Sequence, residues 1–206
     1  MKITNKLLLL LAGPAILLLS GCGPKYTTEE KGAVSIVTNK GGQTLGYATS
    51  SGVGLLEKNG YAFKDLNKNG ELDSYEDWRL PVDERAMDLV SQMNVEQMAG
   101  LMLYSAHQSI PSRGRGFGGG ATYKGKGFDE SGAEASDLSD QQITVLTEDH
   151  VRHVLITSVS SPADAASWNN KAQALVEGLG LGIPVNTSSD PRHRTRASAE
   201  FDYGSG

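Results

Sequence analysis

The sequence predicts an α/β fold, and three consecutive segments near its carboxyl end carry this prediction. Residues 151–159, VRHVLITSV, are mostly apolar and rich in β-branched side chains, as expected of a buried strand. Residues 162–179 place apolar side chains at helical intervals, and a second short strand is indicated at 183–185. A strand, a helix and a strand within about 35 residues form one βαβ unit, so the two strands are expected to be parallel.

The predicted α/β fold is incomplete. Two clear strands cannot close a sheet, and about 150 residues follow position 54. A β/α barrel takes about 250 residues. The domain predicted over residues 81–206 therefore holds too little chain for a whole barrel.

The first 22 residues have the composition of a bacterial signal peptide. Lys2 and Lys6 precede 13 apolar residues at 7–19, a run shorter than the roughly 20 residues that span a bilayer. The sequence LSGC at 19–22 resembles the lipobox of lipoproteins, which predicts a lipid on Cys22, the only cysteine. The alternative is an ordinary signal with an incidental cysteine. Lipidation would attach the protein to a membrane of the cell envelope, on the periplasmic side or at the surface of the outer membrane.

Residues 23–54 are polar and glycine-rich, with one strand indicated at 33–38. This composition predicts a flexible tether between the lipid anchor and the domain.

The segment 55–80 contains the run DLNKNGELDSYED, which fits the calcium loop of EF-hands. Gly70 permits the sharp turn at position 6 of such a loop. Upstream residues do not resemble a helix, so a plain turn rich in Asn, Gly and Asp is the alternative. A bound Ca²⁺ would be structural. Its predicted ligands at positions 1, 3, 5, 7, 9 and 12 are Asp65, Asn67, Asn69, Glu71 through its carbonyl, Asp73 and Glu76.

Helical spacing begins after Pro81. Residues 86–93 place apolar side chains on one face, and Asn94 followed by Gln97 resembles a capping box, which predicts a second helix. The methionine-rich apolar stripe along both helices is expected to pack in the core.

Residues 112–128 are rich in glycine and contain a G-x-G-x-x-G match at Gly114, Gly116 and Gly119. A dinucleotide site needs a strand before this motif and a helix after it, and neither is indicated, so a surface loop is the better interpretation. An RGG-like RNA segment is disfavoured because the net charge is −5 and no basic stripe is interleaved with aromatic residues. No nucleic-acid partner is expected.

Several segments together resemble glycoside hydrolase family 3, which includes the β-glucosidases. The resemblance runs over most of 61–193, and its segments are FKDLNKNGELDSYEDWRLP, DERAMDLVSQMNVEQMAGLM, VRHVLIT, ASWNNKAQALVEGLGLGIPV and NTSSDPRH. It implies that the chain holds the first β/α units of a (β/α)8 TIM-type barrel. It also implies exo-acting hydrolysis of a β-linked glucoside or oligosaccharide, with no cofactor needed for catalysis.

The resemblance assigns one substrate-binding residue. Asp190 matches the family's aspartate after the Gly-Ile-Pro strand, which holds sugar hydroxyls, and a carboxylate can accept two hydrogen bonds from them. The alternative for Asp190 is a helix cap. His193 matches a family histidine and is expected to be structural, although Arg194 stands where the family usually has glycine.

The chain lacks any counterpart of the family's catalytic groups. Retaining glycosidases need a nucleophile and an acid/base about 5 Å apart, and the family's nucleophilic aspartate lies downstream of the elements found here. No catalytic residue is therefore assigned, and the chain alone is expected to be inactive. The alternative function is a cell-surface calcium-binding or adhesion lipoprotein without catalysis.

Overall fold

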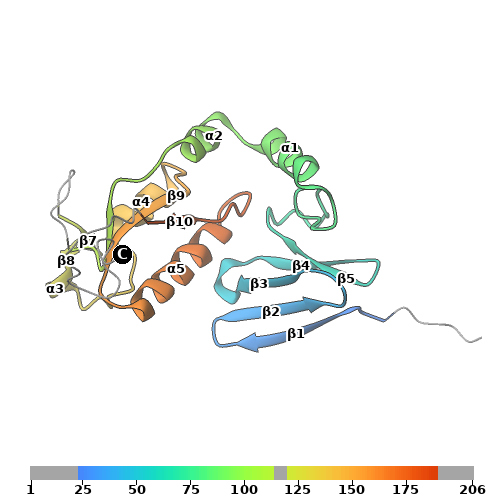
Figure 1. Cartoon of the computed structure of the whole chain (residues 1–206), viewed down its shortest axis with the longest axis horizontal. Coiled ribbons are helices and arrows are strands. Elements are labelled where there is room, and N and C mark those ends of the chain that lie inside the picture. The colour runs from blue at the N-terminus through green and yellow to red at the C-terminus, as the bar shows by residue number, and fades with distance from the viewer. Residues whose placement is uncertain (1–22, 114–119, 190–206) are drawn as a thin grey trace, which may run out of the picture.

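The computed structural model describes residues 23–113 and 120–189, which form two parts (Figure 1). Antiparallel strands make up the amino-terminal part, and the carboxyl-terminal part is built on a parallel sheet with one long helix beside it. The α/β class is therefore confirmed. Over the described residues the parallel sheet has three strands and does not close into a barrel.

Residues 23–54 contain a folded sheet where a flexible tether was expected. Strands β1 (Tyr26–Lys31), β2 (Val34–Asn39) and β3 (Thr44–Ala48) pair antiparallel in this order. The strand indicated at 33–38 is thus confirmed as β2. The prediction that residues 23–54 form a flexible tether is wrong, because most of them belong to this paired sheet. Alternate β2 residues Ser35, Val37 and Asn39 are buried, which is the pattern of a strand with one covered face.

A hairpin follows this sheet and is tied to it. The 3-10 turn η1 (Thr49–Ser51) leads into β4 (Gly54–Lys58) and β5 (Tyr61–Asp65). The Asn39 side chain accepts a hydrogen bond from the Ala62 N–H at 2.8 Å and donates to the Ala62 carbonyl at 3.1 Å. One buried amide therefore satisfies both backbone groups of a residue in β5. The segment before the predicted calcium loop is therefore the strand β5, in agreement with the expectation that no helix precedes this loop.

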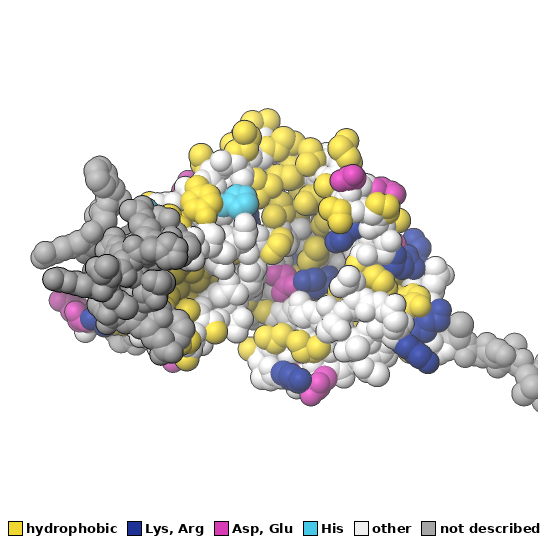
Figure 2. Space-filling model, in the orientation of Figure 1, with side chains coloured by type: hydrophobic (Ala, Val, Ile, Leu, Met, Phe, Trp, Pro, Cys, Tyr) yellow, Lys and Arg dark blue, Asp and Glu magenta, His cyan; other side chains and the backbone are white. Residues whose placement is uncertain are grey.

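Two helices bridge the parts. They are α1 (Val82–Gln92) and α2 (Val95–Met102), and Asn94 forms the predicted capping box with Gln97. Their apolar stripe is only partly covered within the described residues: Val90 is 48% exposed and Met102 is 87% exposed. Figure 2 shows hydrophobic side chains gathered over this region. Met93, between the helices, is buried as expected.

The parallel sheet has the order β10-β9-β6. Its strands are β6 (Gln108–Ile110), β9 (His153–Val159) and β10 (Asn186–Ser188). Helix α5 (Pro162–Glu177) connects β9 to β10, so the predicted βαβ unit is confirmed. The second strand lies three residues later than the predicted range, because Val185 bonds to a side chain of α5 and does not pair with β9.

The core lies between this sheet and α5. Val154 of β9 packs with Trp168, Ala172 and Val176, which recur along one face of α5. Trp168 is 1% exposed, and its indole N–H donates to the Gln142 side chain at 3.1 Å. Burial of these side chains fixes α5 on one face of the sheet.

The segment between β6 and β9 is mostly short elements. These are β7 (Thr122–Tyr123), β8 (Lys126–Gly127), α3 (Phe128–Ser131) and α4 (Asp140–Thr147). Ser139 and Gln142 form a capping box at the start of α4. The three glycines of the G-x-G-x-x-G match lie outside the described residues. In the described parts of the chain, no helix has the length and apolar character needed to cross a membrane.

Candidate functional site

The carboxyl ends of β9 and β10 face the same way, since the two strands are parallel. In β/α proteins this edge carries the binding and catalytic residues. β10 ends at Ser188, and the predicted sugar-binding Asp190 follows two residues later. Asp190 and His193 lie outside the described residues, as does Cys22 at the other end of the chain.

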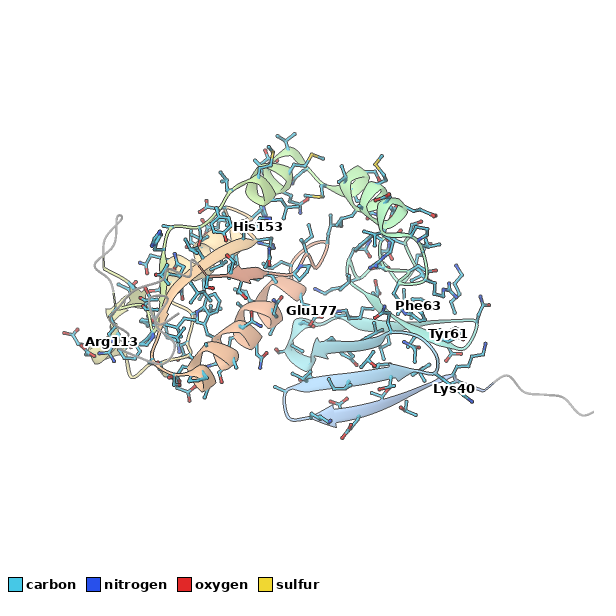
Figure 3. All side chains as sticks on the ribbon, viewed as in Figure 1. Lys40, Tyr61, Phe63, Arg113, His153 and Glu177 are labelled. Atoms are coloured by element: carbon cyan, nitrogen blue, oxygen red, sulfur yellow. The ribbon has the colours of Figure 1, made fainter. Side chains whose placement is uncertain are left out.

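The sheet face opposite α5 carries a polar group of side chains. The ring of His153, which is labelled in Figure 3, stacks on that of Tyr104 with centroids 6.1 Å apart. Nδ1 of His153 lies 3.2 Å from Nδ2 of Asn186. The Tyr104 hydroxyl contacts the Ser188 hydroxyl. These contacts join β9, β10 and the segment before β6. Sequence reasoning did not find them, because their partners are up to 84 residues apart.

The predicted calcium loop follows β5 directly and takes a tightly turned path. Oδ2 of Asp65 accepts a hydrogen bond from the Gly70 N–H at 3.1 Å, which joins loop positions 1 and 6. Gly70 has φ +78°, so it adopts the left-handed conformation that the predicted sharp turn requires. Oδ1 of Asn67 accepts from the Asn69 N–H at 3.1 Å, which is a local turn typical of Asn.

Glu76 closes the loop from the other end. Its Oε1 accepts from the Leu66 N–H at 2.6 Å, and its Oε2 accepts from the Asp73 N–H at 3.2 Å. Burial raises the pKa of the Glu76 carboxyl, while these backbone donors act in the opposite direction. The residue is 5% exposed. The position-12 carboxylate therefore holds the two halves of the loop together through backbone N–H groups.

Two buried oxygen atoms in this loop make no hydrogen bond of good geometry. They are Oδ1 of Asp65 and the hydroxyl of Tyr75. Burial raises the pKa of Tyr75, and the neighbouring carboxylates of Glu76, Asp73 and Asp65 raise it further, so the hydroxyl lies among the loop's acidic groups. Unpaired buried oxygens beside carboxylates suit a cation, since Ca²⁺ takes only oxygen ligands.

The remaining side-chain arrangement gives calcium no direct support. Nδ2 of Asn67 and Nδ2 of Asn69 donate to the same Asp73 oxygen, at 2.6 and 2.9 Å, so both amides are engaged within the loop. Across residues 23–113 and 120–189, no three acidic, histidine or cysteine side chains are grouped closely enough to hold a metal ion. The predicted ligands are thus brought into one loop, but they are not arranged around a common point.

Glu177 is a buried acidic residue that sequence reasoning missed. It ends α5, where a negative charge opposes the helix dipole, and this unfavourable position was the available signal. Its Oε1 accepts from Nζ of Lys64 at 2.7 Å, and its Oε2 accepts from the Ala48 N–H at 2.8 Å. Figure 3 shows Glu177 directed toward the amino-terminal strands. The residue therefore joins α5 to both β3 and β5.

Comparison with known proteins gives a consistent set of relatives. The chain is 42% identical over 143 residues to the periplasmic beta-glucosidase/beta-xylosidase of Dickeya chrysanthemi, covering 68% of this chain and 19% of that protein. It is 27% identical over 150 residues to the probable beta-glucosidase C of Aspergillus oryzae, covering 71% of this chain and 21% of that protein. Beta-glucosidase C of Emericella nidulans is 26% identical over 130 residues, which are 63% of this chain and 18% of that protein.

The chain spans about a fifth of the length of these curated relatives. No family model matches it.

Proposed function

The chain is a homologue of the β-glucosidases of glycoside hydrolase family 3, and on this basis we propose that it is part of an exported, exo-acting glycoside hydrolase. The substrate class is a β-linked glucoside or oligosaccharide. The observation that carries the proposal is the 42% identity to a β-glucosidase/β-xylosidase over 143 residues. The parallel β9-α5-β10 unit supports it, because such a unit is the repeating element of a β/α barrel.

We propose Asp190 as the residue of this chain that binds the sugar. It follows a parallel strand at the edge where barrel enzymes bind substrate. Its carboxylate would accept hydrogen bonds from two adjacent hydroxyls of the sugar next to the cleaved bond. Nucleophile and acid/base would come from further barrel units, so the 206-residue chain alone is not expected to cleave glycosides.

The experiment that tests this function compares the chain alone with the protein encoded by the whole reading frame. Sequencing past codon 206 is expected to show an in-frame continuation that contains a nucleophilic aspartate. The longer protein should hydrolyse an aryl β-glucoside, and the chain alone should not. A stop codon directly after Gly206, together with a folded and monodisperse product, would instead favour a non-catalytic surface lipoprotein.

We propose that the protein is exported and anchored through a lipid on Cys22. The Dickeya relative is named as periplasmic, which agrees with export. The signal-like composition of residues 1–22 supports the lipid anchor.

We propose, finally, that the 65–77 loop can take a structural Ca²⁺. The loop path supports this through the Asp65–Gly70 bond, and the unpaired oxygens of Asp65 and Tyr75 would gain a partner. Binding would require the Asn67 and Asn69 amides to turn their oxygens inward, away from their present bonds to Asp73. The ion would stabilise the loop and would take no part in bond cleavage.

A further inference from the structure

The connection between α5 and β10, residues 178–185, is held mainly by side chains from other elements. Oε1 of Gln173 accepts from the Val185 N–H at 3.1 Å, and its Nε2 donates to the Val185 carbonyl at 2.7 Å. Nε of Arg152 donates to the Ile183 carbonyl at 2.9 Å. These contacts fix the second half of the connection. Gln173 lies in α5 and Arg152 lies just before β9, so both side chains come from the segment that precedes the connection.

The first half of the connection is held from outside the parallel sheet, by the 65–77 loop. Nζ of Lys68 donates to the Gly178 carbonyl at 2.7 Å. Gly178 caps the carboxyl end of α5, whose last turn has no basic residue, so Lys68 supplies the positive charge that favours this end of the helix. A loop more than 100 residues earlier in the chain thereby completes the cap of α5.

Packing between Leu66 and Gly182 adds a second contact between the loop and the connection. A Cβ atom on Gly182 would lie 2.9 Å from Cδ2 of Leu66, and Gly182 has φ +64°. Both the close approach and the left-handed backbone favour glycine at this position. Leu66 is itself held in place by the bond from its N–H to Glu76.

The loop is well placed to act as a rigid support. Lys64 immediately before it pairs with Glu177, and Ala48 bonds to the same carboxylate, so the amino-terminal strands are fixed to the last turn of α5. The 65–77 loop therefore contacts the α5–β10 connection, and the strands that precede this loop are bonded to the last turn of α5.

We propose that Lys68 is a positioning residue, which together with Leu66 fixes the start of the α5–β10 connection and thereby the strand from which Asp190 follows. This inference rests on the proposed sugar-binding role of Asp190. Lys68 touches no reacting atom in this account, and its effect passes through the backbone of residues 178–188.

The test compares Lys68→Ala and Lys68→Arg with Lys126→Ala, a control at an exposed lysine of β8 for which no side-chain partner is found in the described residues. Amide hydrogen exchange is followed in residues 178–188. Because the Lys68–Gly178 hydrogen bond is exposed to solvent, its loss should make exchange there only about three- to tenfold faster in Lys68→Ala. Exchange in α4 should not change. Lys68→Arg should restore most of the protection, because a guanidinium can still donate to the Gly178 carbonyl.

A second readout is the kinetics of the whole enzyme on an aryl β-glucoside. Lys68→Ala should raise KM about three- to tenfold with kcat little changed, as expected when binding common to the ground and transition states is lost. Unchanged exchange at 178–188 in Lys68→Ala would overturn the inference. Faster exchange with unchanged KM would overturn the link to Asp190. Because exchange does not need hydrolysis, a wild-type protein without glycosidase activity would refute the proposed function separately.

Discussion

Oε1 of Glu177 lies 2.7 Å from Nζ of Lys64, and this ion pair joins the last turn of α5 to strand β5 across 113 residues of sequence. The side chains are 11% and 25% exposed, so the pair is largely removed from water. Breaking a buried pair from one side leaves the other charge without a partner, which costs more than the pair itself contributes.

Replacement of Glu177 by Gln should therefore destabilise the fold. The amide keeps an oxygen for Ala48 or Lys64 but loses the charge, so we expect a decrease of about 1–3 kcal/mol in the free energy of unfolding. Urea unfolding at pH 7 measures it. Glu148→Gln is the control, since Glu148 is exposed at the end of α4 and should change stability by less than about 0.5 kcal/mol. Equal effects of the two substitutions would contradict this role for Glu177.

Acid should weaken a second ion pair, between Asp137 and Lys171. Nζ of Lys171 lies 2.6 Å from the Asp137 carboxylate, and the hydrogen bond from Lys171 lowers the pKa of that carboxyl below its ordinary value of 3.8. A group whose pKa is lowered by folding stabilises the fold above its unfolded pKa, and this stabilisation is lost as the pH falls through the folded pKa. The contribution is therefore present at neutral pH, begins to fall near pH 4, and is lost once the pH is below the folded pKa of Asp137.

Lys171→Met removes this ion pair together with the 3.0 Å ion pair between Lys171 and Glu134. Because both side chains are 38% exposed and screened by solvent, the expected loss at pH 7 is no more than about 1 kcal/mol. The difference between the variant and the wild type should shrink between pH 5 and pH 3. An unchanged difference in urea unfolding across this range would show that the ion pair does not stabilise the fold.

The sequence was sufficient to predict the parts of the fold that depend on local patterns. The βαβ unit follows from β-branched residues and helical spacing, and the start of α2 follows from Asn94 and Gln97. The sheet β1-β2-β3 was missed because β1 is exposed along nearly its whole length and shows no alternation. The buried side of β2 includes Ser35 and Asn39, which look like loop residues until their long-range partners are known.

The candidate site was predictable only where it is local. The turned path of the 65–77 loop follows from its Asn, Gly and Asp residues, and the Asp65–Gly70 bond agrees with it. The contact of Lys68 with Gly178 depends on how two distant segments pack, and no short-range pattern encodes it. The exposed stripe on α1 and α2 was misjudged because periodicity identifies an apolar face but not what covers it.

Calcium should raise the stability of the protein if the 65–77 loop binds it. A ligand present at 100 times its dissociation constant stabilises the folded state by about 2.7 kcal/mol. Thermal unfolding in excess EGTA and in millimolar CaCl₂ measures the effect, and Mg²⁺ tests its selectivity. Asp65→Asn should abolish the shift, whereas Asp149→Asn, at an exposed site outside the loop, should keep it. A melting temperature that does not respond to Ca²⁺ would contradict calcium binding and favour the alternative, a plain turn rich in Asn, Gly and Asp.

Lipidation predicts a second, independent effect at the amino terminus. Cys22→Ser should abolish incorporation of labelled palmitate and move the protein from the membrane fraction to the soluble envelope fraction. Because Cys22 is the only cysteine among the 206 residues, no other thiol among them can take up the lipid. Full incorporation of labelled palmitate into the Cys22→Ser variant would contradict the lipid anchor. Export of the protein is not expected to depend on Cys22.

The role of Asp190 is tested most directly by Asp190→Asn in the whole enzyme. The amide is nearly the same size, so folding should be preserved, but one oxygen acceptor becomes a donor and the negative charge is lost. Hydrogen bonds between a charged group and its partner contribute about 1.5–3 kcal/mol, so kcat/KM on an aryl β-glucoside should fall by about 10- to 150-fold. Asp149→Asn serves as the matched control and should leave kcat/KM unchanged, since this exposed residue lies in the turn before β9. A helix-capping role would give a different result: Asn also caps helices well, so the variant would keep both its stability and its activity.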